Sequence, residues 1–272
     1  MTRIAVIGGG RIGEALIAGL LESGRASKDL VVVEPVPARA ELLADRFGIR
    51  ATGVVADAAK SADLIVIAVK PHDVDGVLTE LGKAELGDDR DQVLLSLAAG
   101  IPTLRFEAKL PAGFPVVRAM PNTPMLVGQG ISAIAPGRYA RKEQLALVTE
   151  VLQSVGKVVT VAESQLDAVT AVSGSGPAYF FLVVEAMIDA AVGLGLARDV
   201  AAQLVAQTML GSAALLEESG QSAAELRAGV TSPAGTTAAA VRELERAGVR
   251  SAFYEALNAA KRRSVELGAT PD

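Results

Sequence analysis

The chain has 272 residues, 50% of them hydrophobic, with a formal net charge of −5, one histidine and no cysteine, and this length accommodates one large domain or two ordinary domains. The lack of cysteine excludes disulfides, thiolate catalysis and cysteine-based zinc sites, and a single histidine excludes a multi-histidine metal site. We therefore expect no bound metal, and the negative charge argues against a nucleic-acid partner. The apolar N-terminal run is too short for a signal peptide, and no uninterrupted apolar run reaches roughly 20 residues. We therefore expect a cytoplasmic protein without a membrane partner.

Short β-branched runs alternate with helical stretches in the first part of the chain. The expected strands lie within Arg3–Gly8, Asp29–Pro35, Asp63–Pro71, Gln92–Gly100, Phe114–Pro121, Ile131–Pro136 and Lys157–Val161, and the expected helices include Gly13–Ser23, Pro37–Phe47 and Arg141–Ser154. Continuous apolar strands that alternate with helices are typical of a doubly wound, mainly parallel sheet covered on both faces. We therefore predict a Rossmann-type α/β domain over residues 1–162.

The composition changes near Ala162, and residues 163–272 are predicted to form an all-α domain. The expected helices are Gln165–Val172, Pro177–Leu194, Arg198–Ser219, Gly235–Ala247 and Ser251–Leu267, with Ser219–Glu225 as a helix–helix connection. The helix at Pro177–Leu194 is apolar on nearly every face, so it must be buried inside this domain or against another subunit. Because so small a helical domain forms a thin core alone, we predict a homodimer built through it.

The first expected strand is followed by the pattern Gly8-x-Gly10-x-x-Gly13, which also opens the first expected helix. In this context Gly8 permits the tight turn, Gly10 lets the backbone approach a pyrophosphate, and Gly13 lets the helix pack on the strand. Arg11 and Ile12 lie inside the loop, and Arg11 either approaches a phosphate or lies in solvent. The pattern predicts a dinucleotide site; the alternative is a plain tight turn between strand and helix.

The end of the second strand usually distinguishes NAD from NADP. Glu34 stands there, and a carboxylate at this point can accept a hydrogen bond from the ribose 2′-OH and would repel a 2′-phosphate. Arg39, about one helical turn further, could instead attract the 2′-phosphate. The alternative interpretation of Glu34 is a solvated surface acid. By themselves these residues favour NADH, and we expect NADPH or NADH as cofactor.

Six stretches together resemble the Δ1-pyrroline-5-carboxylate reductases, in order and over essentially the whole chain. They are IGGGRIGEAL at the N-terminus, AVKP (Ala68–Pro71), AAGI (Ala98–Ile101), RAMPNTP (Arg118–Pro124), AVSGSGPAYFF (Ala171–Phe181) and VTSPAGTT (Val230–Thr237). The resemblance implies NAD(P)H-dependent reduction of a cyclic imine to L-proline, the last step of proline biosynthesis. It also implies dimers that interleave their helical domains and assemble into larger rings, with the substrate between the nicotinamide and the hydroxyl-rich loop.

The last of these stretches has more hydroxyls than one helix cap needs: Ser232, Thr236 and Thr237. The backbone N–H groups of Gly235 and the two threonines, at a helix start, can hold the substrate carboxylate. The resemblance assigns the hydrogen bond to the ring nitrogen to Thr237; the alternative for the whole stretch is an ordinary Ser/Thr-rich cap. Family members commonly have two glycines where this chain has Ala234 and Gly235, and we expect that the backbone needs no positive φ at Ala234.

Further candidates come from the ends of expected strands and from the start of the apolar helix. The cofactor-binding candidates beyond the glycine loop are Ala68, Val69, Lys70, Pro71, Ala98, Gly100 and Asn122. Ser173 or Ser175 either touches the substrate or nicotinamide or caps the helix, and we take Ser175 with Thr237 as the catalytic candidates. Glu218 is a candidate contact for the substrate nitrogen, and His72 is expected to be a surface residue rather than a catalytic acid.

Reduction of a protonated imine needs little acid catalysis, because the iminium carbon is already electrophilic and loses its charge as the hydride arrives. We therefore predict that no single acid is essential and that orientation provides most of the rate. One rival interpretation is a two-domain hydroxyacid or keto-acid dehydrogenase, although the Tyr-x-x-x-Lys spacing of short-chain dehydrogenases is absent. The other rival is a dinucleotide-sensing module without turnover, which would have no reason for the hydroxyl-rich stretch.

Overall fold

The structure is a computed structural model that describes residues 2–84, 86 and 91–269. Its contacts divide the chain into two compact units, with Met1–Ser175 and Ala260–Asp272 in unit 1 and Gly176–Ala259 in unit 2. The division between the units falls after the domain boundary predicted at Ala162, because Leu166 is fully buried against strand residues of unit 1. The limits of the two domains themselves remain a prediction.

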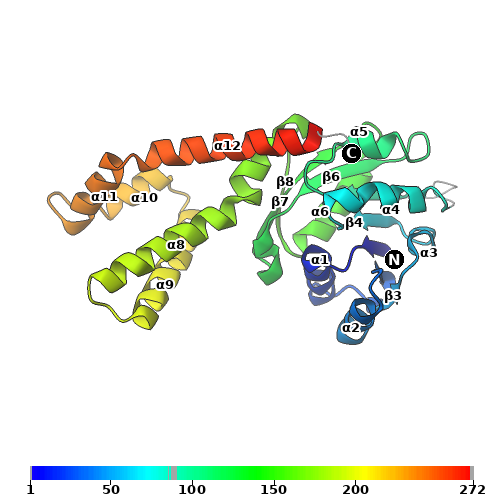
Figure 1. Cartoon of the computed structure of the whole chain (residues 1–272), viewed down its shortest axis with the longest axis horizontal. Coiled ribbons are helices and arrows are strands. Elements are labelled where there is room, and N and C mark those ends of the chain that lie inside the picture. Colours follow the sequence, from blue (N-terminus) through cyan, green and yellow to red (C-terminus); the bar gives the residue numbers. More distant parts are fainter. Residues whose placement is uncertain (1, 85, 87–90, 270–272) are drawn as a thin grey trace. The chain divides into compact units, whose positions relative to one another are not determined.

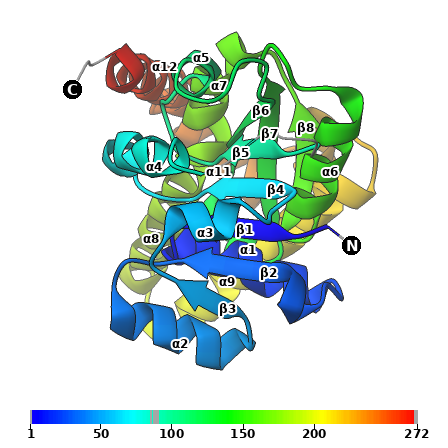
Figure 2. The same cartoon turned by 90° about the vertical axis from the view of Figure 1, so that its right-hand side faces the viewer.

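Unit 1 contains one eight-stranded sheet (Figures 1 and 2). Its strands are β1 (Ile4–Ile7), β2 (Leu30–Val33), β3 (Arg50–Thr52), β4 (Leu64–Ile67), β5 (Val93–Ser96), β6 (Val116–Met120), β7 (Gly130–Pro136) and β8 (Gly156–Thr160). They lie in the order β3-β2-β1-β4-β5-β6-β7-β8, and every neighbouring pair is parallel except β6 and β7. The predicted doubly wound, mainly parallel sheet is confirmed.

Helices cover both faces of this sheet, so the strands are buried on both sides. The described helices of unit 1 are α1 (Arg11–Glu22), α2 (Pro37–Phe47), α3 (Val55–Ala59), α4 (Val74–Leu81), α5 (Thr103–Glu107), α6 (Lys142–Gln153) and α7 (Leu166–Val169). Because side chains alternate along a strand, Ile4 and Val6 of β1 belong to the core shared with α1 and α6, whereas Ala5 and Ile7 belong to the core shared with α3 and α4. This explains why the strands are continuous apolar runs rather than alternating ones.

Some short elements have no counterpart in the sequence prediction. β3 has three half-buried or exposed residues and pairs with β2 at the sheet edge, so it lacks the apolar run that marks the other strands. α3 and α5 have five residues each, too few to display a helical period. The antiparallel pairing of β6 with β7 follows from their short connection over 121–129, since a parallel neighbour needs a crossover of a dozen or more residues.

Unit 2 is helical. Its described helices are α8 (Gly176–Gly193), α9 (Arg198–Glu218), α10 (Ala223–Gly229), α11 (Thr236–Arg246) and the first part of α12 (Val249–Ala269), whose last residues belong to unit 1. α10 begins inside the predicted connection because Ser222 and Glu225 form a capping box, in which each residue accepts the other's backbone N–H. The S-x-x-E spacing that makes this box is readable in the sequence.

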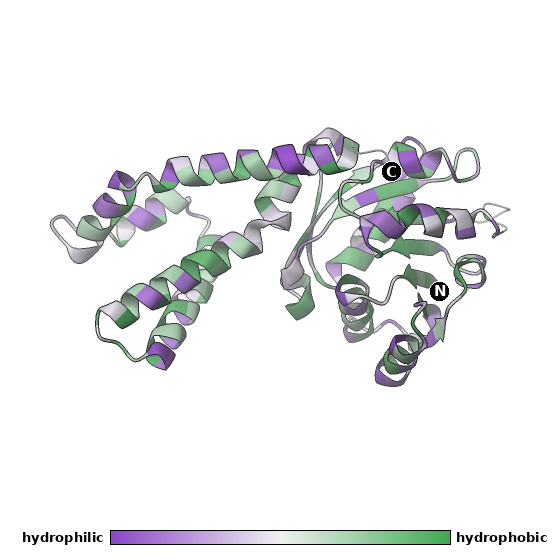
Figure 3. Cartoon of the chain, in the orientation of Figure 1, coloured by the Kyte–Doolittle hydropathy of each residue, from purple (hydrophilic) through white to green (hydrophobic). Residues whose placement is uncertain are grey.

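The apolar helix predicted at Pro177–Leu194 forms as α8, but its side chains are not buried within one chain. Phe180, Phe181 and Leu182 are 59%, 64% and 65% exposed, and Figure 3 shows apolar residues along α8 and α9. Of the two burial alternatives, the interior of one chain's helical unit is therefore excluded. Contact with another subunit is the alternative that remains.

Two helical segments, 163–193 and 198–218, are also long and apolar enough by length and composition to cross a membrane. One or two such helices are weak evidence, because core helices of water-soluble proteins pass the same test. The expectation that the chain has no membrane partner stays a prediction.

Candidate functional site

A cleft of about 710 Å³ lies in unit 1 beside the residues that follow β1, β2, β4, β5 and β6. In open α/β sheets ligands bind at this carboxyl edge, where the strand order reverses. Predicted cofactor residues that line the cleft are Gly8, Gly10, Arg11, Ile12, Glu34, Ala68, Val69, Lys70, Pro71 and Asn122. The structure thus brings residues from four separate stretches of sequence to one surface.

The glycines of the loop differ in what a side chain would meet. At Gly8, which has φ +110°, an added Cβ would lie 2.9 Å from the carbonyl atoms of Ala68. At Gly13 it would lie 2.0 Å from the Gly8 carbonyl oxygen, so this residue serves the packing of α1 on β1 and does not line the cleft. At Gly10 nothing lies within 4 Å. The open space at Gly10 is therefore on the side where a ligand can approach the backbone.

The N-terminus of α1 presents free donors to the same cleft. Gly10 is its N-cap, and no side-chain hydrogen bond caps the helix among the described residues. The N–H groups of Arg11 and Ile12 have no intrahelical acceptor, since the first turn of any helix lacks one. Together with the positive end of the helix dipole they suit a pyrophosphate. The exposed Arg11 lies at the rim.

Glu34 is half-buried and held by the backbone. Its Oε2 accepts the N–H of Gly9 at 3.1 Å, and its Oε1 accepts the N–H of Val36 at 3.0 Å. Arg39 donates from Nε to the Gly9 carbonyl at 3.1 Å and forms an ion pair with Glu14. The interpretation of Glu34 as a freely solvated acid does not fit these contacts, and Arg39 lies outside the cleft lining, tied to the outer side of the loop.

Asn122 has a structural bond and a free amide group. Its Oδ1 accepts the N–H of Ile131 at 2.9 Å, which ties the loop after β6 to β7 and fixes which amide atom is oxygen. No described residue accepts from Nδ2, so this donor is available in the cleft.

His72 is 77% exposed at its side chain and pairs with Asp73 at 3.5 Å. It is absent from the cleft lining, as expected for a surface residue.

The structure does not bring Ala98 and Gly100 to the cleft. Ala98 is 2% exposed and belongs to the core, and Gly100 packs against Gly268 near the end of α12. Their neighbours Leu97 and Ala99 line the cleft instead. The AAGI stretch is thus at the site, but its position in the sequence does not reveal which of its residues face the ligand.

Other lining residues were not predicted individually: Pro35, Asp73, Met120, Pro121, Thr123 and Gly174. Met120, Pro121, Thr123 and Gly174 belong to the two stretches, RAMPNTP and AVSGSGPAYFF, that carry the family resemblance, so a signal for them existed. Pro35 and Asp73 adjoin predicted residues and carry no signal of their own.

Gly174 ends a π-helical turn over Thr170–Gly174, in which the N–H of Ser175 donates to the Thr170 carbonyl at 2.8 Å. Such turns are frequent at functional sites. A Cβ on Gly174 would lie 2.4 Å from Cε of Met120, so the end of the methionine side chain would have to move aside. Ser173 donates its hydroxyl to the Val169 carbonyl at 3.1 Å, whereas no described residue bonds the hydroxyl of Ser175. Of these two serines, Ser175 is the one with a hydroxyl left for a ligand.

The hydroxyl-rich loop lies in unit 2 and forms a turn. The N–H of Gly235 donates to the Ser232 carbonyl at 3.0 Å, and Ala234 has φ +59°. The expectation that Ala234 needs no positive φ is therefore wrong. A turn with Pro233 in its second position and a positive φ in its third is the type II pattern, which prefers glycine in that third position. Ala234 holds a conformation that costs a residue with a side chain about 1–2 kcal/mol.

This turn leads directly into α11, whose N-terminus lacks a side-chain cap among the described residues. Gly235 is the N-cap, and Thr236 and Thr237 are the first helical residues. No described residue bonds the hydroxyls of Ser232, Thr236 or Thr237. Three unused hydroxyls therefore lie in a stretch whose helix N–H groups no side chain satisfies, and the interpretation as an ordinary Ser/Thr cap does not fit. The N–H of Gly235 is expected from the sequence to be free for a carboxylate, but the turn uses it as the donor to the Ser232 carbonyl.

Two further expectations concern unit 2 and metals. Glu218 is the last residue of α9 and is exposed. Its role at the substrate stays a prediction. Within the described ranges, no group of three or more His, Cys, Asp and Glu side chains is placed to hold a metal ion.

Fold and cleft together define the class: an oxidoreductase with a Rossmann-type dinucleotide-binding unit. A family described as "NADP oxidoreductase coenzyme F420-dependent" matches residues 3–100, and one described as "Pyrroline-5-carboxylate reductase dimerisation" matches residues 163–267. A pyrroline-5-carboxylate reductase from Mycobacterium tuberculosis is 53% identical, and the alignment covers 100% of this chain and 99% of that protein. The chain belongs to the pyrroline-5-carboxylate reductase family.

Other relatives agree. The pyrroline-5-carboxylate reductase of Escherichia coli is 37% identical over 97% of this chain and 98% of its own. The structure of the Coxiella burnetii enzyme matches with a TM-score of 0.94 and 36% identity, covering 99% of both chains. The Plasmodium falciparum enzyme, solved with NADP bound, matches with a TM-score of 0.87 and 28% identity over 98% of both chains. The matched dimerisation domain also accounts for the exposed apolar α8 and supports homo-oligomerisation.

Proposed function

We propose that the chain reduces the C=N bond of 1-pyrroline-5-carboxylate to give L-proline, the last step of proline biosynthesis, with NADPH or NADH as hydride donor. The observation that carries this proposal is the start of α11, where unpaired N–H groups and three unused hydroxyls meet in one turn. A small carboxylate with a ring nitrogen matches this set of donors and acceptors. The names of the relatives support the same activity.

For the cofactor, the N–H groups at the start of α1 would hold the pyrophosphate and Glu34 would face the adenosine ribose. Lys70 and Asn122, which both line the cleft, would contact the nicotinamide half. Ser175, beside the π-helical turn, supplies a hydroxyl for the nicotinamide or the substrate. When bound, the reduced nicotinamide supplies the hydride.

For the substrate, the backbone N–H groups of Thr236 and Thr237 would bind the carboxylate, while the N–H of Gly235 closes the turn on the Ser232 carbonyl. The hydroxyl of Thr237 would accept the N–H of the protonated ring nitrogen, with Ser232 completing the loop. Hydride adds to the carbon of the C=N bond, the π electrons pass to nitrogen, and the positive charge is lost without a further proton. Orientation can contribute roughly 7–11 kcal/mol to such a step, so the proposal needs no essential acid.

The assembly and location complete the proposal. Homodimers would form by burying α8 and α9 against a second copy, with larger rings of dimers as the family resemblance implies, and the enzyme would work in the cytoplasm. Hydride transfer needs contact between the nicotinamide carbon and the C=N carbon. The working oligomer must therefore bring a cofactor cleft and a hydroxyl-rich loop together, whether from one chain or from two.

Purified protein mixed with NADPH or NADH and pyrroline-5-carboxylate tests the activity through the loss of absorbance of the reduced nicotinamide. The expected result is cofactor consumption with formation of proline. Consumption with a keto acid but not with the imine would support a hydroxyacid dehydrogenase. Cofactor binding without turnover on either substrate would support a sensing module.

A further inference from the structure

The loop after β5 brings Leu97 and Ala99 to the cofactor cleft, and its start and end are held differently. At the start, the N–H of Leu97 donates to the Ile67 carbonyl at 2.9 Å, within the sheet. At the end, the loop enters the five-residue helix α5 through its N-cap Pro102, whose side chain has no acceptor. The acceptor that the start of α5 needs must therefore come from elsewhere in the chain.

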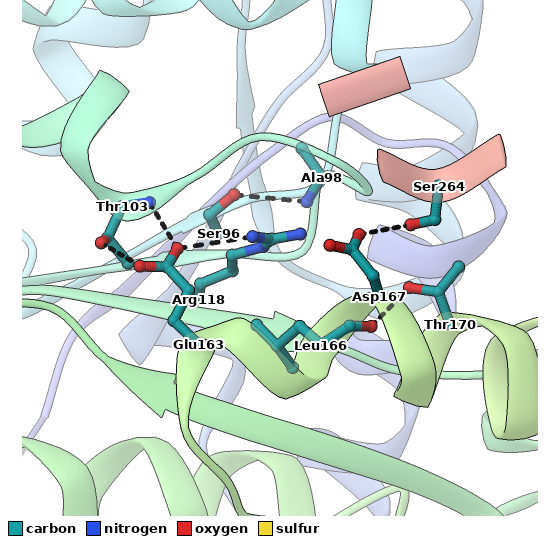
Figure 4. A network of polar contacts seen from close by, with 9 residues as sticks. All are labelled: Ser96, Ala98, Thr103, Arg118, Glu163, Leu166, Asp167, Thr170 and Ser264. Carbon is teal, nitrogen blue, oxygen red and sulfur yellow. Dashed lines mark hydrogen bonds and ion pairs between the residues drawn. The ribbon is translucent and has the colours of Figure 1, made fainter. Parts of the chain in front are cut away.

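Glu163 provides that acceptor from the segment that follows β8. Its Oε1 accepts the N–H of Thr103 and its Oε2 accepts the Thr103 hydroxyl, each at 2.7 Å (Figure 4). Arg118 of β6 places Nη1 3.4 Å from the same Oε1, and its side chain is only 8% exposed. One carboxylate thus joins the end of the β5 loop to the strand that leads to Met120, another lining residue.

The end of α12 holds the middle of the same loop. Ser264, the one described α12 residue that is buried, donates its hydroxyl to Asp167 at 2.7 Å (Figure 4). One turn later, Gly268 lies so close to Gly100 that a Cβ on it would come within 2.7 Å of the Gly100 carbonyl oxygen. The loop is therefore supported by contacts from parts of the chain far from it in sequence.

We infer that Glu163 is a positioning residue for the cofactor: by holding Thr103 it keeps Leu97 and Ala99 in the conformation that lines the cleft. This inference rests on the proposed function, since it takes the cleft to be the dinucleotide site. Hydrogen bonds to an ionised carboxylate are roughly twice as strong as neutral ones. Loss of the Thr103 contacts therefore releases the end of the loop while the sheet still holds its start.

Two variants test the inference, Glu163→Gln and Thr103→Val, with Thr149→Val as the matched control. Thr149 is a half-buried threonine of unit 1, and among the described residues its hydroxyl bonds only the Leu145 carbonyl of its own helix. Titration of the full-length protein with NADPH and NADH, followed by nicotinamide fluorescence, gives the cofactor Kd. Steady-state assays give kcat and both KM values, and thermal melting gives Tm.

We expect the cofactor Kd and KM to rise about tenfold in both test variants, the size of one lost hydrogen bond. The imine KM and the kcat at saturating cofactor should stay within about twofold, and Thr149→Val should match the wild type. A merely structural role would lower Tm and leave the Kd of the folded protein unchanged, and that result overturns the inference. If Glu163→Gln does not fold, Thr103→Val decides alone, because it keeps the ion pair between Glu163 and Arg118.

A second comparison approaches the loop from α12. Gly268→Ala should weaken cofactor binding in the same direction, since its Cβ must push the Gly100 carbonyl away. Gly76→Ala in α4 is the matched control, because nothing lies within 4 Å of its added Cβ. Wild-type protein that binds the dinucleotide without reducing the imine would overturn the proposed function alone. Wild-type activity with unchanged Kd values in Thr103→Val and Gly268→Ala would overturn the positioning role alone.

Discussion

The carboxylate of Glu34 accepts the backbone N–H of Gly9 at 3.1 Å, so the acid that ends β2 is attached to the loop that ends β1. This contact places a negative charge where the adenosine ribose of a dinucleotide would lie. Glu34 holds the glycine loop, and experiment can separate this role from the proposed discrimination between the two cofactors.

Glu34→Ser should raise the ratio of kcat/KM for NADPH to kcat/KM for NADH by about tenfold, because it removes the charge that repels a 2′-phosphate. It should also lower the free energy of unfolding by about 1 kcal/mol, since the N–H groups of Gly9 and Val36 lose their acceptor. Assays with both cofactors and denaturant titration measure these effects. Glu41→Ser, at an exposed acid of α2, is the control, and an unchanged cofactor ratio in Glu34→Ser would remove its selective role.

Gly10→Ala and Gly13→Ala should fail in different ways. The Cβ of Gly10→Ala enters open space, so the protein should keep its Tm but lose cofactor affinity, because the methyl group occupies the path of the pyrophosphate. The Cβ of Gly13→Ala would lie 2.0 Å from the Gly8 carbonyl oxygen, so the variant should be destabilised by several kcal/mol, of order 1–3 or more. Melting curves and cofactor titration distinguish the two, and equal losses of Tm would refute the assignment.

Substitutions at Ala234 test the strained turn before α11. Ala234→Val should destabilise the loop by about 1–2 kcal/mol and raise the KM for the imine, because a β-branched residue tolerates positive φ poorly. Ala234→Gly should leave KM unchanged and stability equal or slightly higher, since relief of strain offsets the greater freedom of the unfolded chain. A valine variant with wild-type KM would mean that the loop does not depend on this φ.

Thr237→Val tests whether the α11 hydroxyl orients the substrate or acts as an essential acid. We expect a loss of about ten- to a thousandfold in kcat/KM, with much of it recovered in Thr237→Ser, because an orienting hydrogen bond contributes a limited factor. General acid catalysis typically contributes 10²–10⁴-fold, so a loss of kcat beyond about ten-thousandfold at unchanged substrate affinity would contradict the mechanism. Steady-state kinetics of both variants provide the measurement.

The pH dependence of stability should include a contribution from Asp75 of α4. Hydrogen bonds from Arg105 and then Lys109 lower the pKa of this carboxyl to about 2. Since the folded pKa lies below the unfolded value of about 3.9, the contribution is fully present above about pH 5 and is lost as the pH falls through 2. Solvent screening limits it to about 1 kcal/mol or less. Asp75→Asn should lower Tm at pH 7, and the difference from the wild type should become much smaller near pH 2. An equal difference at both values would contradict this.

The local pattern of the sequence was sufficient for most of the sheet and for the glycine loop. Apolar runs and helical periods depend on neighbouring residues, so β1, β2 and the helix at Arg11–Glu22 are readable without knowledge of the fold. The same holds for the loop at Gly8 to Gly13, because strand, turn and helix follow one another directly. The three-residue β3 was not readable, because an edge strand this short carries no apolar period.

Tertiary structure alone decided which residues of a recognised stretch face the ligand and what supports them. Leu97 and Ala99 line the cleft while Ala98 is buried, and this depends on how the loop leaves the sheet. The positive φ of Ala234 arises from closure of the turn by the Gly235 N–H. The bond between Glu163 and Thr103 joins residues 60 positions apart. Such contacts depend on the packing of distant segments, which no local pattern of residues encodes.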